Sequence, residues 1–257
     1  MTEKAIHTVL VTGAGRRIGR AIALGLARDG HAIAVHYRDS SDEAEAVVAE
    51  ITRAGGRAVA LRADLSREDE VRELIGRAAD ALGPVDCLIN NASVFENDSA
   101  DDVTRASWDA HMETNLRAPF VLTQALAAAL PANAGGNVIN IIDERVRNLT
   151  PHFISYTLSK AGLWTLTQTL ALALAPRIRV NAVGPGPILP SPRQTQAQFD
   201  RQASLMPLGR GSTPDEICDA VRFILAAPAM TGQMIALDGG QHLGWAQPGL
   251  DGAAQQE

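Results

Sequence analysis

Tyr156 and Lys160 lie four residues apart in the segment YTLSK, a spacing that places both side chains on one face of a helix. A lysine ammonium beside a phenol favours the phenolate and lowers the pKa of the tyrosine from about 10 toward neutral pH. Tyr156 can then donate a proton as a general acid. The same spacing also occurs on surface helices, so a catalytic interpretation depends on the neighbouring motifs.

Asp143, in the segment NIIDERV, is a second residue that can hold a proton, 13 residues before Tyr156. An ionised carboxylate only accepts hydrogen bonds, and it would repel the negative charge that develops on a ketone oxygen during reduction. Reduction of a C=N bond differs, because the nitrogen must receive a proton as hydride reaches the carbon. A carboxylic acid hydrogen-bonded to Tyr156 can supply or relay that proton. Alternatively, Asp143 caps a turn ahead of the charged residues ERVRN.

The segment TGAGRRIG, residues 12–19, follows an apolar run and opens a helical one. At such a junction, glycines let backbone N–H groups and the helix N-terminus reach a pyrophosphate, which indicates a dinucleotide site. A bulky cation, Arg17, stands where a further glycine is expected. A tight turn without a ligand is the alternative. The candidate phosphate-binding residues are Gly13, Gly15, Arg16, Arg17, Ile18 and Gly19.

The end of the next apolar run discriminates between the two nicotinamide cofactors. An NAD-binding protein usually presents a carboxylate here to the ribose 2′-hydroxyl, whereas this chain reads HYRDS, residues 36–40. His36, Arg38 and Ser40 suit a 2′-phosphate, so NADPH is the predicted cofactor. Asp39 lies one or two positions beyond the expected acid, and we predict that it forms a turn or caps a helix.

These motifs lie at the ends of strands in an alternating series of short β-branched runs and longer segments of helical period. The alternation predicts a doubly wound α/β Rossmann fold with about seven parallel strands, in a single domain over residues 1–257. Ligands of such sheets bind beyond the carboxyl ends of the strands, where every motif above falls. The predicted strands cover residues 7–12, 32–37, 57–63, 85–90, 137–142, 177–183 and 233–238. The predicted helices cover residues 17–29, 42–55, 67–81, 105–130, 154–175 and 213–226.

Composition narrows the class of protein. With 257 residues, 46% of them hydrophobic, the chain can bury the core of one large α/β domain. Its net charge of −6, without a stripe of Lys and Arg, argues against nucleic-acid binding. No apolar stretch reaches membrane-spanning length and no signal-peptide pattern occurs, so a cytoplasmic location is expected. Cys87 and Cys218 are predicted to be small buried hydrophobes, and no metal site is predicted.

Together these motifs resemble the short-chain dehydrogenase/reductase family. TGAGRRIG matches T-G-x-x-x-G-x-G with Arg17 in place of the second glycine, while NNAS (90–93), YTLSK and GPGPI (184–188) follow at the family's places. The resemblance covers nearly the whole chain, from VTGAGRRIG to ALDGG (236–240). It implies a homotetramer in which the segments 105–130 and 154–175 pair across subunits.

The resemblance also implies roles for individual residues. Asn115, a poor helix former inside a helical segment, would hold a water in the proton relay, or else would only distort the helix. Lys160 would bind the nicotinamide ribose as well as act on Tyr156. Asp64 would lie beside the adenine, and the segment around Ile188 would meet the carboxamide. The further cofactor contacts are Tyr37, Leu65, Asn91, Ala92, Ser93, Pro185 and Gly186.

The family normally has a serine at the position of Asp143. With Asp143 in place of that serine, and with Arg17, HYR and NNASVF, the sequence resembles the pteridine reductases and the related bacterial dihydropteridine (dihydromonapterin) reductases. That resemblance implies that Arg17, Ser93 and Phe95 bind a pterin whose reactive edge meets Asp143 and Tyr156. A flat bicyclic ring would stack between the nicotinamide and Phe95, while Arg17 donates to its acceptors. The alternatives are a Phe95 that packs on the core and an Arg17 that binds phosphate alone.

Three functions are open at this point. The first is NADPH-dependent hydride transfer to a C=N bond of a dihydropterin. The second is NADPH-dependent reduction of a carbonyl, in a 3-oxoacyl thioester or a sugar. The third is a non-catalytic NADPH sensor or scaffold, which leaves Asn115, Tyr156 and Lys160 without a reason to occur together. Residues 187–213 are predicted to form a mobile substrate loop, and Trp245 to cover the site or a neighbouring subunit.

Overall fold

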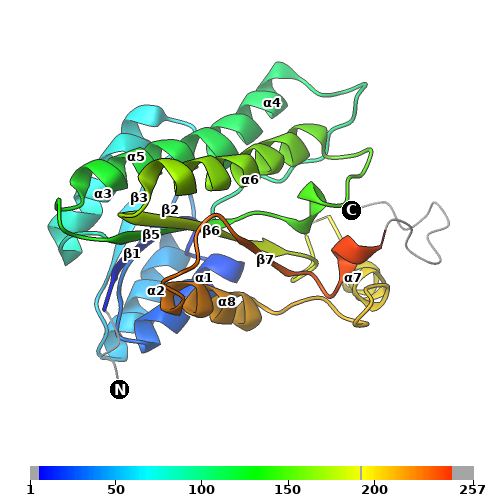
Figure 1. The fold of residues 1–257 in the computed structure, drawn as a ribbon. Coiled ribbons are helices and arrows are strands. Elements are labelled where there is room, and N and C mark those ends of the chain that lie inside the picture. The colour runs from blue at the N-terminus through cyan, green and yellow to red at the C-terminus, as the bar shows by residue number, and fades with distance from the viewer. Residues whose placement is uncertain (1–5, 192, 245–257) are drawn as a thin grey trace.

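A seven-stranded parallel sheet between two layers of helices forms the protein in the computed structural model, which describes residues 6–191 and 193–244 (Figure 1). The strand order is β3-β2-β1-β4-β5-β6-β7, and every neighbouring pair is parallel. The predicted doubly wound fold is confirmed. Trp245 lies outside the described residues. The strands are β1 Thr8–Val11, β2 Ala32–Tyr37, β3 Ala58–Arg62, β4 Cys87–Asn90, β5 Gly136–Ile141, β6 Ile178–Pro185 and β7 Met234–Leu237.

Two hydrophobic cores lie on opposite faces of the sheet. Because side chains alternate along a strand, Val9 and Val11 of β1 enter one core and Leu10 enters the other. The first core is covered by α1 (Arg17–Arg28), α2 (Ser41–Arg53) and α8 (Pro214–Ala226). The second is covered by α3 (Glu68–Leu82), α5 (Ala118–Ala129) and α6 (Ile154–Leu174). Cys87 and Cys218 are buried and free, as predicted.

Two segments differ from their prediction. The expected helix 105–130 consists of α4 (Arg105–Met112), a π-helix (Glu113–Arg117) and α5. The expected substrate loop 187–213 contains a further helix, α7 (Gln196–Ser204). Its start is fixed by a capping box in which the side chains of Thr195 and Gln198 each bond to the other's backbone N–H. The T-x-x-Q pattern of residues 195–198 is the sequence signal for this box.

The strand order places a topological switch point beside β1. The chain leaves β1 toward β2 and β3 on one side, and then returns to β4 on the other. Loops that follow β1 and β4 therefore diverge and leave a crevice at the carboxyl edge of the sheet. No helix within the described ranges is long and apolar enough to cross a membrane.

Candidate active site

A cavity of about 800 Å³ lies at this carboxyl edge, between the loops that follow the strands. It brings together every site residue predicted from the sequence except Gly15 and Asn115. These lining residues are Gly13, Arg16, Arg17, Ile18, Gly19, His36, Tyr37, Arg38, Ser40, Asp64, Leu65, Asn91, Ala92, Ser93, Phe95, Asp143, Tyr156, Lys160, Pro185, Gly186 and Ile188. Among the described residues, no group of His, Cys, Asp or Glu could hold a metal ion.

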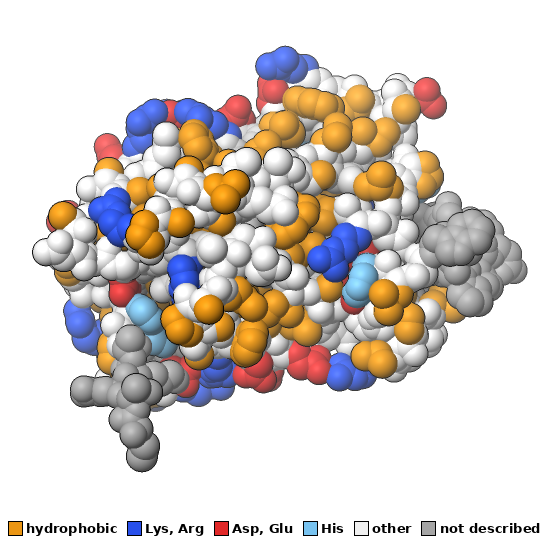
Figure 2. Space-filling view, in the orientation of Figure 1, with side chains coloured by type: hydrophobic (Ala, Val, Ile, Leu, Met, Phe, Trp, Pro, Cys, Tyr) orange, Lys and Arg blue, Asp and Glu red, His pale blue; other side chains and the backbone are white. Residues whose placement is uncertain are grey.

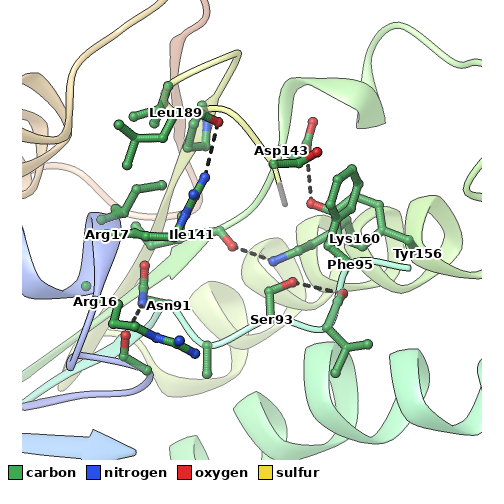
Figure 3. A pocket seen from close by; sticks show the side chains of 18 of the residues that line it. Arg16, Arg17, Asn91, Ser93, Phe95, Ile141, Asp143, Tyr156, Lys160 and Leu189 are labelled. Carbon is green, nitrogen blue, oxygen red and sulfur yellow. Dashed lines mark hydrogen bonds between the residues drawn. The ribbon is translucent and has the colours of Figure 1, made fainter. Parts of the chain in front are cut away.

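Asp143, Tyr156 and Lys160 meet at one wall of the cavity (Figure 3). Tyr156 Oη donates a hydrogen bond to Asp143 Oδ2 at 2.7 Å. Lys160 Nζ donates to the Ile141 carbonyl at 2.9 Å and lies 5.8 Å from the centre of the Tyr156 ring. Burial lowers the pKa of Lys160 to about 8, although nearby Asp143 opposes the shift. Tyr156 and Asp143 can therefore exchange a proton directly, whereas Lys160 acts on the pair through its charge.

The Asp143 carboxylate is fixed from two sides. Its Oδ1 accepts the Arg145 N–H at 2.8 Å and so caps the short 3₁₀-helix Glu144–Val146. Its Oδ2 accepts from Tyr156. The two interpretations of this residue, a turn cap and a partner of the phenol, are therefore compatible, because each uses a different oxygen.

The side chain of Asn115 is fully occupied by the protein. Its Oδ1 accepts the Val94 N–H at 2.8 Å and the Ser93 hydroxyl at 3.2 Å. Its Nδ2 donates to the Val94 carbonyl at 2.9 Å and to Ser159 Oγ at 3.0 Å. An asparagine amide makes about four such bonds, so a relay water would have to bind the backbone of the π-helix instead. That role remains a prediction.

The phosphate loop is shaped for close approach of an anion. Gly13 has φ +64°, and a Cβ at Gly19 would lie only 2.3 Å from the Gly13 carbonyl oxygen. Helix α1 begins with no side-chain cap and no acidic residue in its first turn. Its N-terminal N–H groups therefore have no competing carboxylate, which fits the pyrophosphate of a dinucleotide.

Arg16 and Arg17 point in different directions (Figure 3). Arg17 has φ +53°, the left-handed region that favours the glycine of the usual motif. Its guanidinium donates to the carbonyls of Pro190 at 2.9 Å and Leu189 at 3.1 Å, and so holds the loop after β6. Arg16 is exposed and lies 3.7 Å from Glu43. The two arginines thus serve different parts of the cavity.

His36 does not have its predicted role. Its Nδ1 accepts the Gly13 N–H at 3.0 Å, and its Nε2 lies 3.0 Å from the Ala63 carbonyl, to which it donates. Burial lowers the pKa of His36 to about 4, so the ring is neutral. The prediction that His36 binds a 2′-phosphate is wrong, because both nitrogens already hold the phosphate loop against β2 and the chain after β3.

Arg38 and Ser40 remain at the cavity wall beyond β2. Arg38 is exposed and donates to Asp39 Oδ2 at 2.6 Å. Asp39 does not cap α2, whose N-cap residue is Ser40. The described ion pair of Arg38 is with Asp39, and both side chains are exposed. Because water already screens this pair, the Arg38 guanidinium can bind a phosphate instead.

Phe95 both packs and lines the cavity. Its ring stacks on Phe153, with centres 4.6 Å apart, and meets the Tyr156 ring edge-on at 4.7 Å. The Arg193 guanidinium lies 5.2 Å from its centre. Phe153 and Arg193 were not predicted, because they lie far along the chain and no local motif marks them.

The fold is that of a known family. The profile of the short chain dehydrogenase family matches residues 7–201, and the chain belongs to this family. A 3-oxoacyl-[acyl-carrier-protein] reductase of Synechocystis sp. is 35% identical over 244 residues, which cover 93% of this chain and 98% of that protein.

Solved structures give a second set of relatives. The chain is 49% identical, with a TM-score of 0.91, to FolM alternative dihydrofolate reductase 1 from Brucella canis, crystallised with NADP; the match covers 95% of this chain and 97% of that one. A short chain dehydrogenase from Burkholderia cenocepacia, also in complex with NADP, is 37% identical with a TM-score of 0.85, and the match covers 91% and 97% of the two chains.

Proposed function

We propose that this protein is an NADPH-dependent reductase that transfers hydride to a C=N bond of a dihydropterin. The observation that carries the proposal is the 2.7 Å hydrogen bond between Tyr156 Oη and Asp143 Oδ2. A carboxyl group at this place suits protonation of nitrogen and does not suit stabilisation of an alkoxide. The 49% identity to a structure named as an alternative dihydrofolate reductase supports the same substrate class.

The cofactor proposal is supported by the residues present. The uncapped α1 N-terminus and the Gly13–Gly19 cradle fit a pyrophosphate, and Arg38 and Ser40 fit a 2′-phosphate. Bound NADPH supplies the hydride. We expect NADPH to bind at least tenfold more tightly than NADH, or about 1.4 kcal/mol. Arg38→Gln should remove most of this difference in titrations of cofactor fluorescence, while NADH affinity stays the same; comparable affinities in the wild type would refute the cofactor choice.

Residues of this protein then supply the proton. Hydride adds to the carbon of the C=N bond, and the nitrogen takes one proton from the Asp143–Tyr156 pair, whose oxygens are 2.7 Å apart. Lys160 lies behind the phenol and favours the anion that remains. Solvent returns the proton after the product leaves.

The shape of the cavity also suits a flat ring system. Phe95 offers an aromatic surface beside Tyr156, and the Ser93 hydroxyl is exposed nearby. Arg17 lies across the cavity from them, where a guanidinium can donate to ring acceptors (Figure 3). Aromatic stacking with one or two directed hydrogen bonds is a sufficient basis for pterin recognition.

Carbonyl reduction is the second candidate, and the curated relatives favour it. Several are 3-oxoacyl-[acyl-carrier-protein] reductases, including one of Staphylococcus epidermidis that is 36% identical over 241 residues, 92% of this chain and 99% of that protein. Under this alternative Asp143 is a structural cap that the reaction tolerates. A non-catalytic NADPH-binding scaffold is the third candidate, and it predicts no turnover of either substrate.

The rate of NADPH oxidation, measured with dihydropterins, folates, 3-oxoacyl thioesters and simple ketones as substrates, distinguishes the three candidate functions. Asp143→Ser, the residue usual in the family, should reduce kcat/KM for pterins by on the order of a hundredfold, the scale of a lost general acid, and should spare or improve any ketone reduction. Asp39→Ser is the control, because this exposed carboxylate also lies at the cavity. Equal losses on both substrates would leave Asp143 as a cap only.

A further inference from the structure

A second polar cluster lies behind Tyr156, outside the cavity lining. It consists of Asp98, His111 and Ser155, each at most 3% exposed and each from a different segment. Ser155 Oγ donates to Asp98 Oδ2 and lies 2.7 Å from His111 Nδ1. The Glu96 N–H donates to His111 Nε2 at 3.1 Å.

The direction of every hydrogen bond in this chain is determined. A backbone N–H can only donate, so His111 Nε2 is the acceptor of the Glu96 N–H. A neutral imidazole then carries its proton on Nδ1, and burial lowers the pKa of His111, which favours the neutral ring. Nδ1–H therefore donates toward Ser155 Oγ, with the Ser107 carbonyl as a second acceptor, and the serine hydroxyl donates onward to Asp98. This chain of hydrogen bonds runs from the Glu96 N–H to the Asp98 carboxylate.

The carboxylate at its end also caps α6. Ser155 N–H donates to Asp98 Oδ1 at 3.1 Å, and the Phe153 N–H donates to the Asp98 carbonyl at 2.8 Å. The N-cap residue, Phe153, has φ +58° and offers no side-chain cap of its own. Asp98, 57 residues earlier than Ser155, supplies the cap instead.

The cluster thus joins two segments that carry the proposed site. The segment 93–98 carries Ser93 and Phe95, and the first turn of α6 carries Tyr156. The His111 ring meets the Tyr156 ring edge-on, with centres 6.0 Å apart. A shift of about 1 Å between such groups is enough to change catalytic rates by about a hundredfold.

We infer that Asp98, Ser155 and His111 are positioning residues, whose directed hydrogen-bond chain sets Phe95 and Tyr156 in register for the reaction. This inference rests on the proposed function only in the choice of a dihydropterin as the substrate for the activity measurements. The hydrogen bonds from Glu96 to Asp98 all run in one donor-to-acceptor direction, which we call the polarity of this hydrogen-bond chain. Substitutions of similar size should therefore be harmless where they preserve that polarity and damaging where they break it.

Asp98→Asn breaks the polarity whichever way the amide turns. With its NH₂ group toward Ser155 Oγ, the serine hydroxyl either donates to His111, so that the opposite imidazole nitrogen becomes a donor facing the Glu96 N–H, or accepts from both neighbours and loses the Asp98 carboxylate as acceptor for its own proton. With its NH₂ group toward the Ser155 N–H, two donors meet at the start of α6. His111→Gln preserves the polarity, because one amide can accept from Glu96 and donate to Ser155.

A set of four variants tests the inference with dihydropterin kcat/KM, NADPH affinity and melting temperature. Asp98→Asn should lower kcat/KM at least tenfold with NADPH affinity unchanged, whereas His111→Gln should stay within about threefold, because only the first leaves a buried donor unpaired. Adding His111→Glu to Asp98→Asn should restore most of the activity, because the new carboxylate accepts from both Glu96 and Ser155. His111→Gln also shows whether a side chain of that length fits. The exposed Asp102→Asn, in the same stretch of chain, should be silent.

Two outcomes overturn the inference: equal losses in Asp98→Asn and His111→Gln, or a double variant no more active than Asp98→Asn. A third readout is independent of substrate. Nitrogen-15 NMR of the wild-type protein should find the His111 proton on Nδ1, and a proton on Nε2 would contradict the chain. If wild-type protein reduced no dihydropterin, the proposed function would fail, while the NMR result and the variants measured on any reducible ketone would still decide the positioning role.

Discussion

Under the proposed function, proton transfer at Tyr156 depends on the charge of Lys160. It is 2% exposed, and its ammonium is held by the Ile141 carbonyl at 2.9 Å. Burial disfavours its charged form and lowers its pKa to about 8, against the opposing effect of Asp143. A lysine is a cation below its pKa and neutral above it. The electrostatic support for a Tyr156 phenolate is therefore present at neutral pH and is lost as the pH rises through about 8.

This titration predicts an alkaline limit to activity. We expect kcat/KM to fall as the pH rises above about 8, approaching tenfold per pH unit well above that pKa, because only the cationic enzyme supports the proton transfer. Initial rates from pH 6 to 10 at saturating NADPH would show the fall, with melting temperatures at each pH to establish that the protein stays folded. A rate that is flat to pH 10 would mean that the Lys160 charge does not contribute.

At the scale of elements, Arg17 links the start of α1 to the loop that leaves β6. Its left-handed backbone costs roughly 1–2 kcal/mol for a residue other than glycine. The guanidinium of the same residue holds the carbonyls of Leu189 and Pro190. A strained residue that makes such contacts indicates a functional constraint at this position. Arg17 therefore connects the phosphate loop to the loop after β6, which lines the cavity.

Arg17→Gly should separate strain from function. The relief of strain and the greater freedom of glycine in the unfolded chain oppose each other, so the free energy of unfolding should change by less than about 1 kcal/mol. The KM for a dihydropterin should rise at least tenfold, and backbone hydrogen exchange at Ile188, Leu189 and Ser191 should become faster. Arg16→Gly is the matched control, because Arg16 contacts neither Leu189 nor Pro190. A dihydropterin KM that stays the same would leave Arg17 as a phosphate ligand alone.

The elements that could be predicted from the sequence are those marked by a pattern in consecutive residues. Buried parallel strands read as apolar runs, and the phosphate loop and YTLSK are short motifs whose places at strand ends follow from the fold. The π-helix at Asn115 was not predicted, because it depends on the bonds of that side chain to Val94 and Ser159. The role of His36 was misjudged for a similar reason, since its partners come from β1's loop and the end of β3.

At the scale of the whole molecule, one face is more apolar than its surroundings. Figure 2 shows hydrophobic side chains gathered across the side where α6, β7 and α8 lie in Figure 1, with most charged side chains at its margins. Large hydrophobic side chains stand out from both helices: Leu172 on α6 is 83% exposed and Phe223 on α8 is 56% exposed. Apolar surface of this kind is stabilised by burial against a partner.

The family resemblance predicts a homotetramer in which the segments 105–130 and 154–175 pair across subunits, and this surface adds α8 to the expected interfaces. Light scattering should give a mass four times that of the 27.2 kDa chain. Leu172→Arg should lower the mass, because a charge buried at an interface without a partner costs several kcal/mol. Arg72→Leu, which removes a charge from the exposed surface of α3, should leave the mass unchanged. The first turn of α6 positions Tyr156, so a loss of activity that parallels dissociation would show that assembly supports the site, whereas a monomeric wild type would contradict the tetramer.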